Sequence, residues 1–372
     1  MNLRIAGMGW VTPLGRGVDA VWARLLRGDE ATAQSISDSV SDRIYSAFRV
    51  PDETLKDLPP HPRLRRASAI SRFAAAAGLD AITQAKSAIG QIEPERTALL
   101  FAVSNGGVVY TKRFYQGLVE AGAQSASPLL FPETVFNAPA SHLAAILGIT
   151  GVSYTLVGDG AVGVLAIKMA HDLLENQPLD FCLVVGAEEA DWLLCDAYRK
   201  WRLLKKQPPI ELFADPPRGM ILSEGAGAVL LSREGAVEID AIDAGGNFSH
   251  RHEANEILRR IVQELAAEHA CVIASANGTF VDLAEREAIK REQPKATVYS
   301  LKAALGESVG ASGIWQMIAG AQALRSKRLP EIAHSNPNAG LNFPTSDEFS
   351  YRKAIVLSCG LNQQAAGARL SI

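Results

Sequence analysis

The sequence is poor in cysteine, and the few cysteines it has are scattered. Its 372 residues include 4 cysteines, with no Cys-x-x-Cys pair and no histidine nearby at metal-ligand spacing. This distribution is typical of buried, reduced thiols and argues against a disulfide framework or a cysteine-based zinc site. His250 and His252 have a weak metal-binding spacing that no cluster of carboxylates or cysteines supports. We therefore expect no metal and no cofactor.

The sequence also lacks a strong charge imbalance and a long apolar run. Its formal net charge is −3, which gives no indication of nucleic acid or an anionic membrane as a partner. No apolar run reaches the length of a membrane span. The opening residues MNLRIAGMGWVTPLG favour a short strand and a glycine turn over a secretory signal. We expect a cytoplasmic protein with neither a nucleic-acid nor a membrane partner.

Aromatic residues are scarce at 6%, whereas the chain has 31 glycines and many alanines. Small residues let helices lie close to sheets, so this composition favours an α/β protein over a β-sandwich. Strand-like and helical patterns alternate, which predicts mostly parallel sheets covered by helices. A second series of elements begins after about Glu234. We therefore expect two similar halves, residues 1–235 and 236–372.

The strands expected from apolar runs are Leu3–Ala6, Ile44–Val50, Thr97–Val103, Tyr154–Val157, Phe181–Val185, Ala226–Ser232, Val237–Ala244, Cys271–Ser275, Val298–Leu301 and Lys353–Cys359. The expected helices are Ala20–Arg27, Leu64–Ala85, Ser141–Leu147, Ala161–Glu175, Glu253–Glu268, Leu283–Arg291 and Gly310–Arg325. Apart from the strand candidate Ile44–Val50, the stretch Asp29–Pro60 is expected to be mostly polar loop.

The most informative segment is GVSYTLVGDGAVGVLAI, which spans Gly151–Ile167. It predicts a strand, a tight Gly-Asp-Gly turn and the start of a helix. Such a bend usually presents a nucleophile, because backbone N–H groups and the helix dipole stabilise developing negative charge. Here the tip of the bend is Gly160, which has no side chain. The sequence therefore predicts a bend of the kind that presents a nucleophile, but without a nucleophilic side chain.

Five segments in consistent order together resemble the β-ketoacyl synthase family. They are IAGMGWVTPLGRGVDAVWARLLRGD at the start, FPETVFNAPASHLAAILGITGVSYTL before the bend, then VVGAEEA, RGMILSEGAGAVLL and SLKAALGESVGASG. The resemblance runs nearly end to end. It implies an α/β, thiolase-like, five-layered αβαβα fold built from two similar mixed-sheet halves.

The resemblance also implies which positions would carry chemistry. The family condenses an acyl group on a cysteine with a malonyl unit on a carrier protein, assisted by two histidines. Gly160 stands at the position of the cysteine, Asn277 at that of the first histidine and Glu307 at that of the second. The supporting Lys302 is retained, and Glu287 is a candidate for a structural glutamate of the family. No catalytic residue is expected.

Each replacement has a chemical consequence. Glycine offers no nucleophile, and Asn277 cannot exchange a proton near neutral pH. An ionised Glu307 would repel a developing enolate, so we interpret it as an ion-pair partner of Lys302. The family's gate loop is altered as well, since it reads Gly360, Leu361, Asn362 and Gln363. These changes predict a pseudoenzyme, a chain that does not catalyse condensation on its own.

The resemblance further implies a role as the chain-length factor of a type II polyketide or fatty-acid-like system. Such a factor pairs with an active ketosynthase in a heterodimer and shapes the pocket for the growing acyl chain. We favour a reducing system such as an aryl polyene pathway, because glycine rather than glutamine replaces the cysteine and the chain is short. Candidate chain-length determinants in the acyl channel are Tyr110, Thr111, Phe114 and Phe136, although each could equally be a core residue.

Two other classes of function stay open. A relocated nucleophile could be Asp159 or Cys359, although a turn residue and a buried thiol are the simpler interpretations. Alternatively the chain could be a docking module for the acyl carrier protein. Arg65 and Arg66 lie in one basic cluster and Arg199–Lys206 form another, and either could equally be a solvated face.

Overall fold

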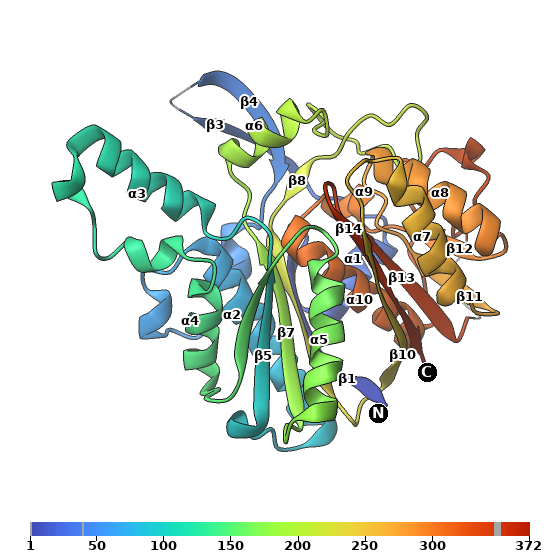
Figure 1. Ribbon diagram of the computed structural model, residues 1–372, viewed down its shortest axis with the longest axis horizontal. Coiled ribbons are helices and arrows are strands. Elements are labelled where there is room, and N and C mark those ends of the chain that lie inside the picture. Colours follow the sequence, from blue (N-terminus) through green and yellow to red (C-terminus); the bar gives the residue numbers. More distant parts are fainter. Residues whose placement is uncertain (1, 39–40, 346–350) are drawn as a thin grey trace.

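The fold is organised around one large mixed sheet (Figure 1), in a computed structural model that describes residues 2–38, 41–345 and 351–372. The strand order is β12-β11-β13-β14-β10-β1-β9-β7-β5-β6, and β2 pairs with β1. Its strands are β1 (Leu3–Thr12), β2 (Gly15–Arg16), β5 (Thr97–Val103), β6 (Ser153–Val157), β7 (Phe181–Glu188), β9 (Gly225–Ser232), β10 (Val237–Asn247), β11 (Ala270–Ile273), β12 (Thr297–Tyr299), β13 (Lys353–Cys359) and β14 (Gln364–Ser371).

The large sheet consists of two halves joined at a narrow seam. β1 and β10 pair antiparallel over three residues, with Leu3–Ile5 opposite Val237–Ile239. On one side of the seam β5 is parallel to β6 and β7, while β9 is antiparallel to β7 and β1. On the other side β11 is parallel to β12 and β13, while β14 is antiparallel to β13 and β10. Both halves are therefore mixed, as the resemblance implied.

Helices complete five layers. α5 (Val162–Asn176) and α10 (Val309–Ser326) contact strands of both halves and form the central layer. α2 (Ala69–Ile89) packs on β1, β7 and β9 at one outer face, and α7 (Glu253–Glu264) packs on β10, β13 and β14 at the other, with α8 (Phe280–Glu292) beside it. The order αβαβα confirms the predicted fold. α10 is buried on every side from Val309 to Leu324, as expected for a helix inside a large core.

Small residues permit the close packing that the composition predicted. A Cβ atom placed on Gly9 of β1 would lie 1.9 Å from the carbonyl oxygen of Ala77 on α2, so no side chain fits there. α2 contributes Ala74, Ala77, Ala81 and Ala85 to this interface, all of them fully buried. The helix backbone therefore lies directly against the strand.

Several elements differ from the sequence prediction. The polar stretch after Asp29 contains a hairpin of β3 (Ala33–Asp38) and β4 (Ser41–Phe48), and β4 pairs with β8 (Leu222–Ser223). α3 (Val108–Ala121) is an additional helix that extends outward from the body (Figure 1). The remaining helices are α1 (Val18–Leu26), α4 (Ala138–Leu147), α6 (Trp192–Lys200), α9 (Lys302–Leu305) and the 3-10 helices η1 (Asp52–Leu55), η2 (Pro62–Leu64), η3 (Pro94–Arg96), η4 (Ala123–Ser125), η5 (Phe131–Thr134) and η6 (Pro337–Ala339). Within the described residues, no helix combines the length and hydropathy of a membrane span.

Candidate functional site

Gly160 lies at the bend between β6 and α5, as predicted, and it is buried. A Cβ atom on Gly160 would lie 3.1 Å from the carbonyl oxygen of Cys359 and 3.2 Å from the Cα of Gly360. Both distances are shorter than ordinary van der Waals contact, so the loop after β13 covers the tip closely. The hydroxyl of Ser358 donates to the carbonyl oxygen of Gly160 over 2.8 Å. The bend therefore presents neither a side chain nor room for one without local movement.

Asn277 and Glu307 are brought together, although they are 30 residues apart in the sequence. The Nδ2 of Asn277 donates to Oε2 of Glu307 over 2.6 Å. The Oδ1 of Asn277 accepts from the hydroxyl of Thr279, also over 2.6 Å, and Thr279 caps the start of α8. The amide of Asn277 is thus fixed in orientation, with both ends in use. It acts here as a structural link rather than a free hydrogen-bond donor.

Both carboxylate oxygens of Glu307 interact with neighbouring side chains. The ammonium of Lys302 lies 2.6 Å from Oε2 of Glu307, and the hydroxyl of Ser312 donates to Oε1 over 2.5 Å. The Lys302 and Glu307 side chains are only 1% and 2% exposed. This is the ion pair expected from the sequence, and burial in low dielectric makes such a pair costly to break. Ser312 was not predicted, because a serine in a glycine-rich helix start has no distinctive pattern.

The buried carboxyl group beside this site belongs to Glu285, which corrects the expectation for Glu287. Glu285 is fully buried on α8 and accepts from the backbone N–H of Ser275 over 2.8 Å and from its hydroxyl over 2.5 Å. Burial raises the pKa of Glu285 to about 7. Glu287 is two residues further along, about 200° around the helix. Its side chain is half exposed and pairs with Arg286.

The positions of the family's gate loop, Gly360 to Gln363, connect β13 to β14. Leu361 is 5% exposed, whereas Asn362 is exposed. Cys359, at the end of β13, is 2% exposed, and its backbone N–H donates to the hydroxyl of Ser275 over 3.0 Å. Burial raises the pKa of the Cys359 thiol well above its usual range. The tip, the gate loop and the Asn277 region are therefore connected by direct contacts.

The four candidate chain-length residues lie on α3 and beside η5. The phenol of Tyr110 donates to the carbonyl oxygen of Arg66 over 3.0 Å, and the hydroxyl of Thr111 donates to the carbonyl oxygen of Gly107 over 3.0 Å. The ring of Phe114 lies 5.7 Å from that of Phe131, measured between centroids. Phe136 is 45% exposed. These side chains form part of an open surface and not of the fully buried core.

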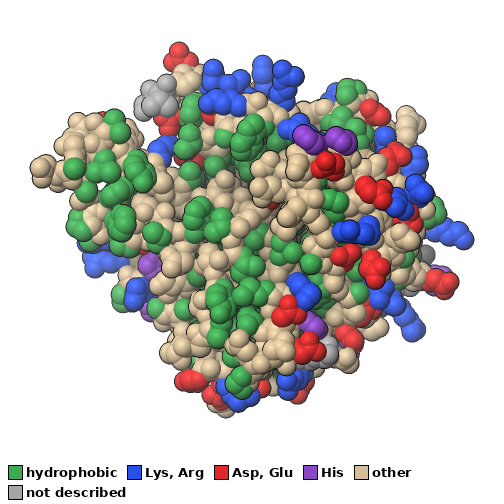
Figure 2. All heavy atoms as spheres, viewed as in Figure 1, with side chains coloured by type: hydrophobic (Ala, Val, Ile, Leu, Met, Phe, Trp, Pro, Cys, Tyr) green, Lys and Arg blue, Asp and Glu red, His purple; other side chains and the backbone are tan. Residues whose placement is uncertain are grey.

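That surface is apolar and continues onto the edge of the large sheet. Figure 2 shows hydrophobic side chains over α3 and beside β5 on this face. β6 is the end strand of the sheet, paired with β5 alone, and its Tyr154 and Val157 are about half exposed. The other large exposed apolar residues of α3 and the segment after it are Tyr115, Val119, Leu129, Phe131, Val135 and Phe136. An apolar edge of this kind is typical of a protein interface.

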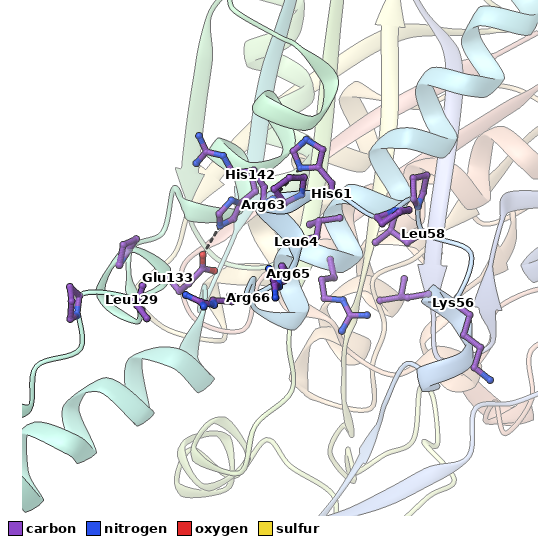
Figure 3. A pocket seen from close by; sticks show the side chains of 17 residues that line it. Lys56, Leu58, His61, Arg63, Leu64, Arg65, Arg66, Leu129, Glu133 and His142 are labelled. Carbon is purple, nitrogen blue, oxygen red and sulfur yellow. Dashed lines mark hydrogen bonds and ion pairs between the residues drawn. The ribbon is translucent and has the colours of Figure 1, made fainter.

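Arg65 and Arg66 border a cavity of about 1070 Å³ between the segment 55–66, the start of α2 and η5 (Figure 3). Arg63 and Arg72 also line it, and none of the four guanidinium groups has an acidic partner among the described residues. Glu133 is the one carboxylate in the lining, and it is bound to the Nε2 of His142 over 2.5 Å. Burial acts to raise the pKa of Glu133, but the contacts with His142 and Ser68 outweigh it, and the pKa is lowered. The wall is therefore strongly cationic.

The second basic run is largely paired. Arg199 and Lys200 both interact with Asp196, and Lys205 lies 3.0 Å from a carboxylate oxygen of Glu211. These contacts leave less unpaired positive charge here than around Arg65 and Arg66. Hydrogen bonds from Tyr45, Lys200 and Arg43 hold the pKa of Asp196 well below its usual range.

Comparison with protein families agrees with this architecture. The family model described as "Beta-ketoacyl synthase, N-terminal domain" matches residues 2–236, and that described as "Beta-ketoacyl synthase, C-terminal domain" matches residues 235–336. Among curated proteins, 3-oxoacyl-[acyl-carrier-protein] synthase 2 of Vibrio cholerae is 24% identical, over 91% of this chain and 89% of that protein. The chloroplastic synthase I of Arabidopsis thaliana is 23% identical, over 92% of this chain and 79% of that protein.

Solved structures share the fold over the full chain. The ishigamide ketosynthase/chain length factor matches with a TM-score of 0.85 at 20% identity, covering 100% of this chain and 98% of that chain. A ketosynthase in complex with its chain length factor from Xenorhabdus doucetiae matches with a TM-score of 0.82 at 19% identity, with the same coverage. At these identities the likeness concerns the fold alone.

Proposed function

Because the chain belongs to the beta-ketoacyl synthase family, we propose that it is a non-catalytic subunit that pairs with an active ketosynthase. In this proposal it acts as a chain-length factor and contributes walls to the acyl-chain pocket of its partner. The observation that carries the proposal is the buried link between Asn277, Glu307 and Lys302 beside an empty bend at Gly160. Where the family's chemistry needs a thiol and two imidazoles, this chain has a closed structural network.

The network supports inactivity on chemical grounds. Condensation needs a thiolate at the bend, and Gly160 supplies no nucleophilic atom. Polarising a malonyl thioester carbonyl needs donors aimed at the developing oxyanion. The Asn277 amide is directed to Glu307 instead, and the Glu307 carboxylate would oppose negative charge. The Lys302 ammonium is held by the same carboxylate.

The apolar surface supports pairing with a second subunit. The edge strand β6 leaves one side of its backbone unpaired within the described chain, and Tyr154 and Val157 flank it. A strand from another ketosynthase subunit would cover this edge and the neighbouring apolar residues of α3. Phe114 and Phe136 would then lie at the boundary between the subunits, together with Tyr110 and Thr111, where they could limit the length of an acyl chain.

Reconstitution of the pair tests the proposal. The chain is co-expressed with a ketosynthase that has its cysteine and both histidines, together with the matching acyl carrier protein. We expect a stable one-to-one complex whose products are longer or more uniform than those of the ketosynthase alone. The isolated chain should neither decarboxylate malonyl-carrier protein nor form an acyl-enzyme. A monomer indifferent to the ketosynthase, or condensation by the isolated chain, would contradict the proposal.

The pathway is part of the same proposal. A type II polyketide or fatty-acid-like system, with aryl polyenes as the preferred product class, follows from glycine in place of the cysteine and from the short chain. Detection of conjugated polyenes in the reconstituted system, when a ketoreductase and a dehydratase are added, would support this choice. Aromatic products would instead indicate an aromatic type II polyketide system.

A relocated nucleophile has less support. Both oxygens of Asp159 accept backbone N–H groups, and the Cys359 thiol is buried with a raised pKa. Treatment of the native chain with an acyl electrophile, followed by peptide mapping, distinguishes an enzyme with a relocated nucleophile from a non-catalytic subunit. Acylation of Cys359 that competes with acyl carrier protein would favour an enzyme over a pseudoenzyme.

We further propose that acyl carrier protein docks at Arg65 and Arg66. Carrier proteins that bind ketosynthases are acidic, and these two side chains lie on the cationic wall of the cavity in Figure 3. The absence of acidic partners for them among the described residues leaves their charge available to an approaching protein. This docking role would serve the paired ketosynthase, because the chain itself has no acceptor for an acyl group.

A further inference from the structure

Asp159 connects two segments that are distant in the sequence. Its Oδ1 accepts from the backbone N–H of Gly160 over 2.7 Å, at the bend before α5. Its Oδ2 accepts from the backbone N–H groups of Asn362 and Gln363, over 2.7 and 3.1 Å. Hydrogen bonds to an ionised acceptor are about twice as strong as those between neutral groups. A single carboxylate therefore binds the tip of the bend to the loop 360–363.

The same loop is held from two other directions. The backbone N–H of Gly360 donates to the carbonyl oxygen of Gln364 over 2.7 Å, which closes the turn. The carbonyl oxygen of Gln363 accepts from the backbone N–H of Phe248 over 2.6 Å. Asp159 supplies the polar contacts between the middle of the loop and the bend, and the buried side chain of Leu361 anchors the loop to the core. Removal of the Asp159 carboxylate would therefore loosen the loop at Asn362 and Gln363 while Leu361 and the ends stay attached.

The space around Asp159 explains why residue 360 is a glycine. A Cβ atom on Gly360 would lie 2.2 Å from Oδ2 of Asp159, a distance that no real Cβ contact adopts. The Gly360 backbone itself is not in the left-handed region. The requirement for glycine here is therefore the close approach of the carboxylate and not an unusual backbone conformation.

We propose that Asp159 is a latch that holds the loop 360–363 closed over Gly160. Closure covers the bend and buries the Cys359 thiol, whose sulfur lies 3.5 Å from the carbonyl oxygen of Gly360. A thioester arm cannot reach the bend of this subunit while the latch is engaged. The inference concerns the isolated chain, so it stands or falls independently of any ketosynthase partner.

Access to Cys359 reports the state of the latch. The Asp159→Ala variant of the full chain is treated with iodoacetamide under native conditions, and labelling of each cysteine is followed by peptide mapping. We expect Cys359 to react at least about tenfold faster than in the wild type, since two charge-assisted hydrogen bonds to the loop are lost. Hydrogen exchange at residues 360–364 should accelerate by a similar factor. Labelling and exchange within twofold of the wild type would overturn the proposal.

Controls separate opening of the loop from unfolding. Cys182, Cys195 and Cys271 are also buried and should keep their wild-type rates if only the loop opens. The matched variant Asp172→Ala removes an aspartate near the end of α5, where its oxygens pair with Lys168 on the surface. It should leave labelling of Cys359 unchanged. Equal acceleration in Asp172→Ala, or of all four cysteines together, would show general destabilisation and contradict a latch.

The Gly360→Ala variant tests the latch without removing its carboxylate. Its Cβ collides with Oδ2 of Asp159, so we expect faster labelling of Cys359 in this variant as well. In the double variant Asp159→Ala with Gly360→Ala the contacts of the new Cβ with Oδ2 and Cγ are absent and only the one with the Cβ of residue 159, at 2.9 Å, remains. The added alanine at 360 should therefore speed labelling much less than it does in the wild-type background. If the two effects simply multiply, or if a folded Gly360→Ala labels as slowly as the wild type, Asp159 does not hold the loop.

Discussion

Glu307 is the centre of the buried polar network at the candidate site. One of its oxygens receives both Lys302 and Asn277, and the other receives the hydroxyl of Ser312. A buried ammonium tolerates loss of its counter-charge poorly, because desolvation is not compensated. The carboxylate therefore explains how the chain can keep Lys302 without the histidine that the family's motif places at this position.

The first prediction concerns this ion pair. Glu307→Gln should lower the free energy of unfolding by about 3–5 kcal/mol, because Lys302 is left charged and buried without a partner. Adding Lys302→Met should recover part of the loss, since the uncompensated charge is removed. Urea unfolding followed by circular dichroism measures the two single variants and the double variant. A double variant that loses the full sum of the single effects would show that the two side chains do not interact.

The second prediction concerns the pH dependence that Glu285 confers. An unfolded glutamate titrates near 4.3, whereas burial raises the pKa of Glu285 to about 7 in the folded chain. The folded state thus retains a proton that the unfolded state releases. The contribution of Glu285 to stability is present below about pH 4.3 and is lost as the pH rises through 7, by at most about 1.4 kcal/mol per pH unit.

Glu285→Gln should remove that slope. The difference in unfolding free energy between wild type and variant is measured from pH 4.5 to 7.5, so that contributions of groups that do not interact with Glu285 cancel. We expect the variant to gain stability relative to the wild type as the pH rises. Glu287→Gln, on the exposed side of the same helix, is the matched control and should follow the wild-type profile. A constant difference across this range would contradict the assignment.

At the scale of elements, most of the strands and helices that build the core were predicted. β14 was missed although it is a buried strand between β13 and β10, because its alanines and glycine have low β-propensity. β5 and β13 have the predicted bounds, since each is a continuous run of buried or nearly buried residues. α3 was missed, because none of its residues is buried and two of its large apolar side chains, Tyr115 and Val119, are exposed. β3 was missed as well, because its residues are polar and partly exposed. Sequence patterns report burial, so elements that lie outside the core leave a weak signal.

Some residues of the candidate site could likewise be predicted from the sequence, and others could not. Gly160, Asn277, Glu307 and Lys302 could be identified because sequence motifs surround them. The contacts of Ser312 could not, since they depend on how the start of α10 meets the loop after α9. Glu287 was chosen as the structural glutamate instead of Glu285, because the sequence does not show which glutamate of α8 meets Ser275. Local sequence patterns identify single residues of the site, whereas long-range packing determines which of them are in contact.

The third prediction tests β6 as the pairing edge. Tyr154→Arg and Val157→Arg place a charge on either side of a strand whose free edge would pair with the partner subunit. We expect each to weaken association with the active ketosynthase at least about thirtyfold, equivalent to the loss of one interface hot spot. Analytical ultracentrifugation of the purified chains gives the dissociation constants.

A matched variant distinguishes interface from general surface effects. Ile44→Arg alters another exposed apolar residue, on β4, and should leave association unchanged. All three variants should keep the wild-type melting temperature as isolated chains, because the substituted side chains are 46% to 67% exposed. Unchanged association of both β6 variants would place the partner elsewhere.

At the scale of the whole molecule, the two halves of the sheet meet over only three residue pairs of β1 and β10. α5 and α10 pack against both halves and bridge this seam. α5 begins at the bend of Gly160, and α10 begins beside Glu307. The network of Asn277, Glu307 and Lys302 therefore lies where the halves are joined, and it contributes to the packing that holds them together.

The last prediction uses the charge distribution of the molecule. With a net charge of −3, the chain as a whole would repel an acidic carrier protein, so docking depends on the local cationic wall at Arg65 and Arg66. Replacing both with glutamate should weaken carrier-protein binding to the reconstituted heterodimer at least about tenfold at 0.1 M salt, and by less at 0.5 M, where screening is stronger. Formation of the heterodimer should not change. Arg218→Glu, an exposed arginine already paired with Glu211, is the control and should bind carrier protein as the wild type does. Undiminished binding by the double variant would assign carrier-protein docking to the ketosynthase partner alone.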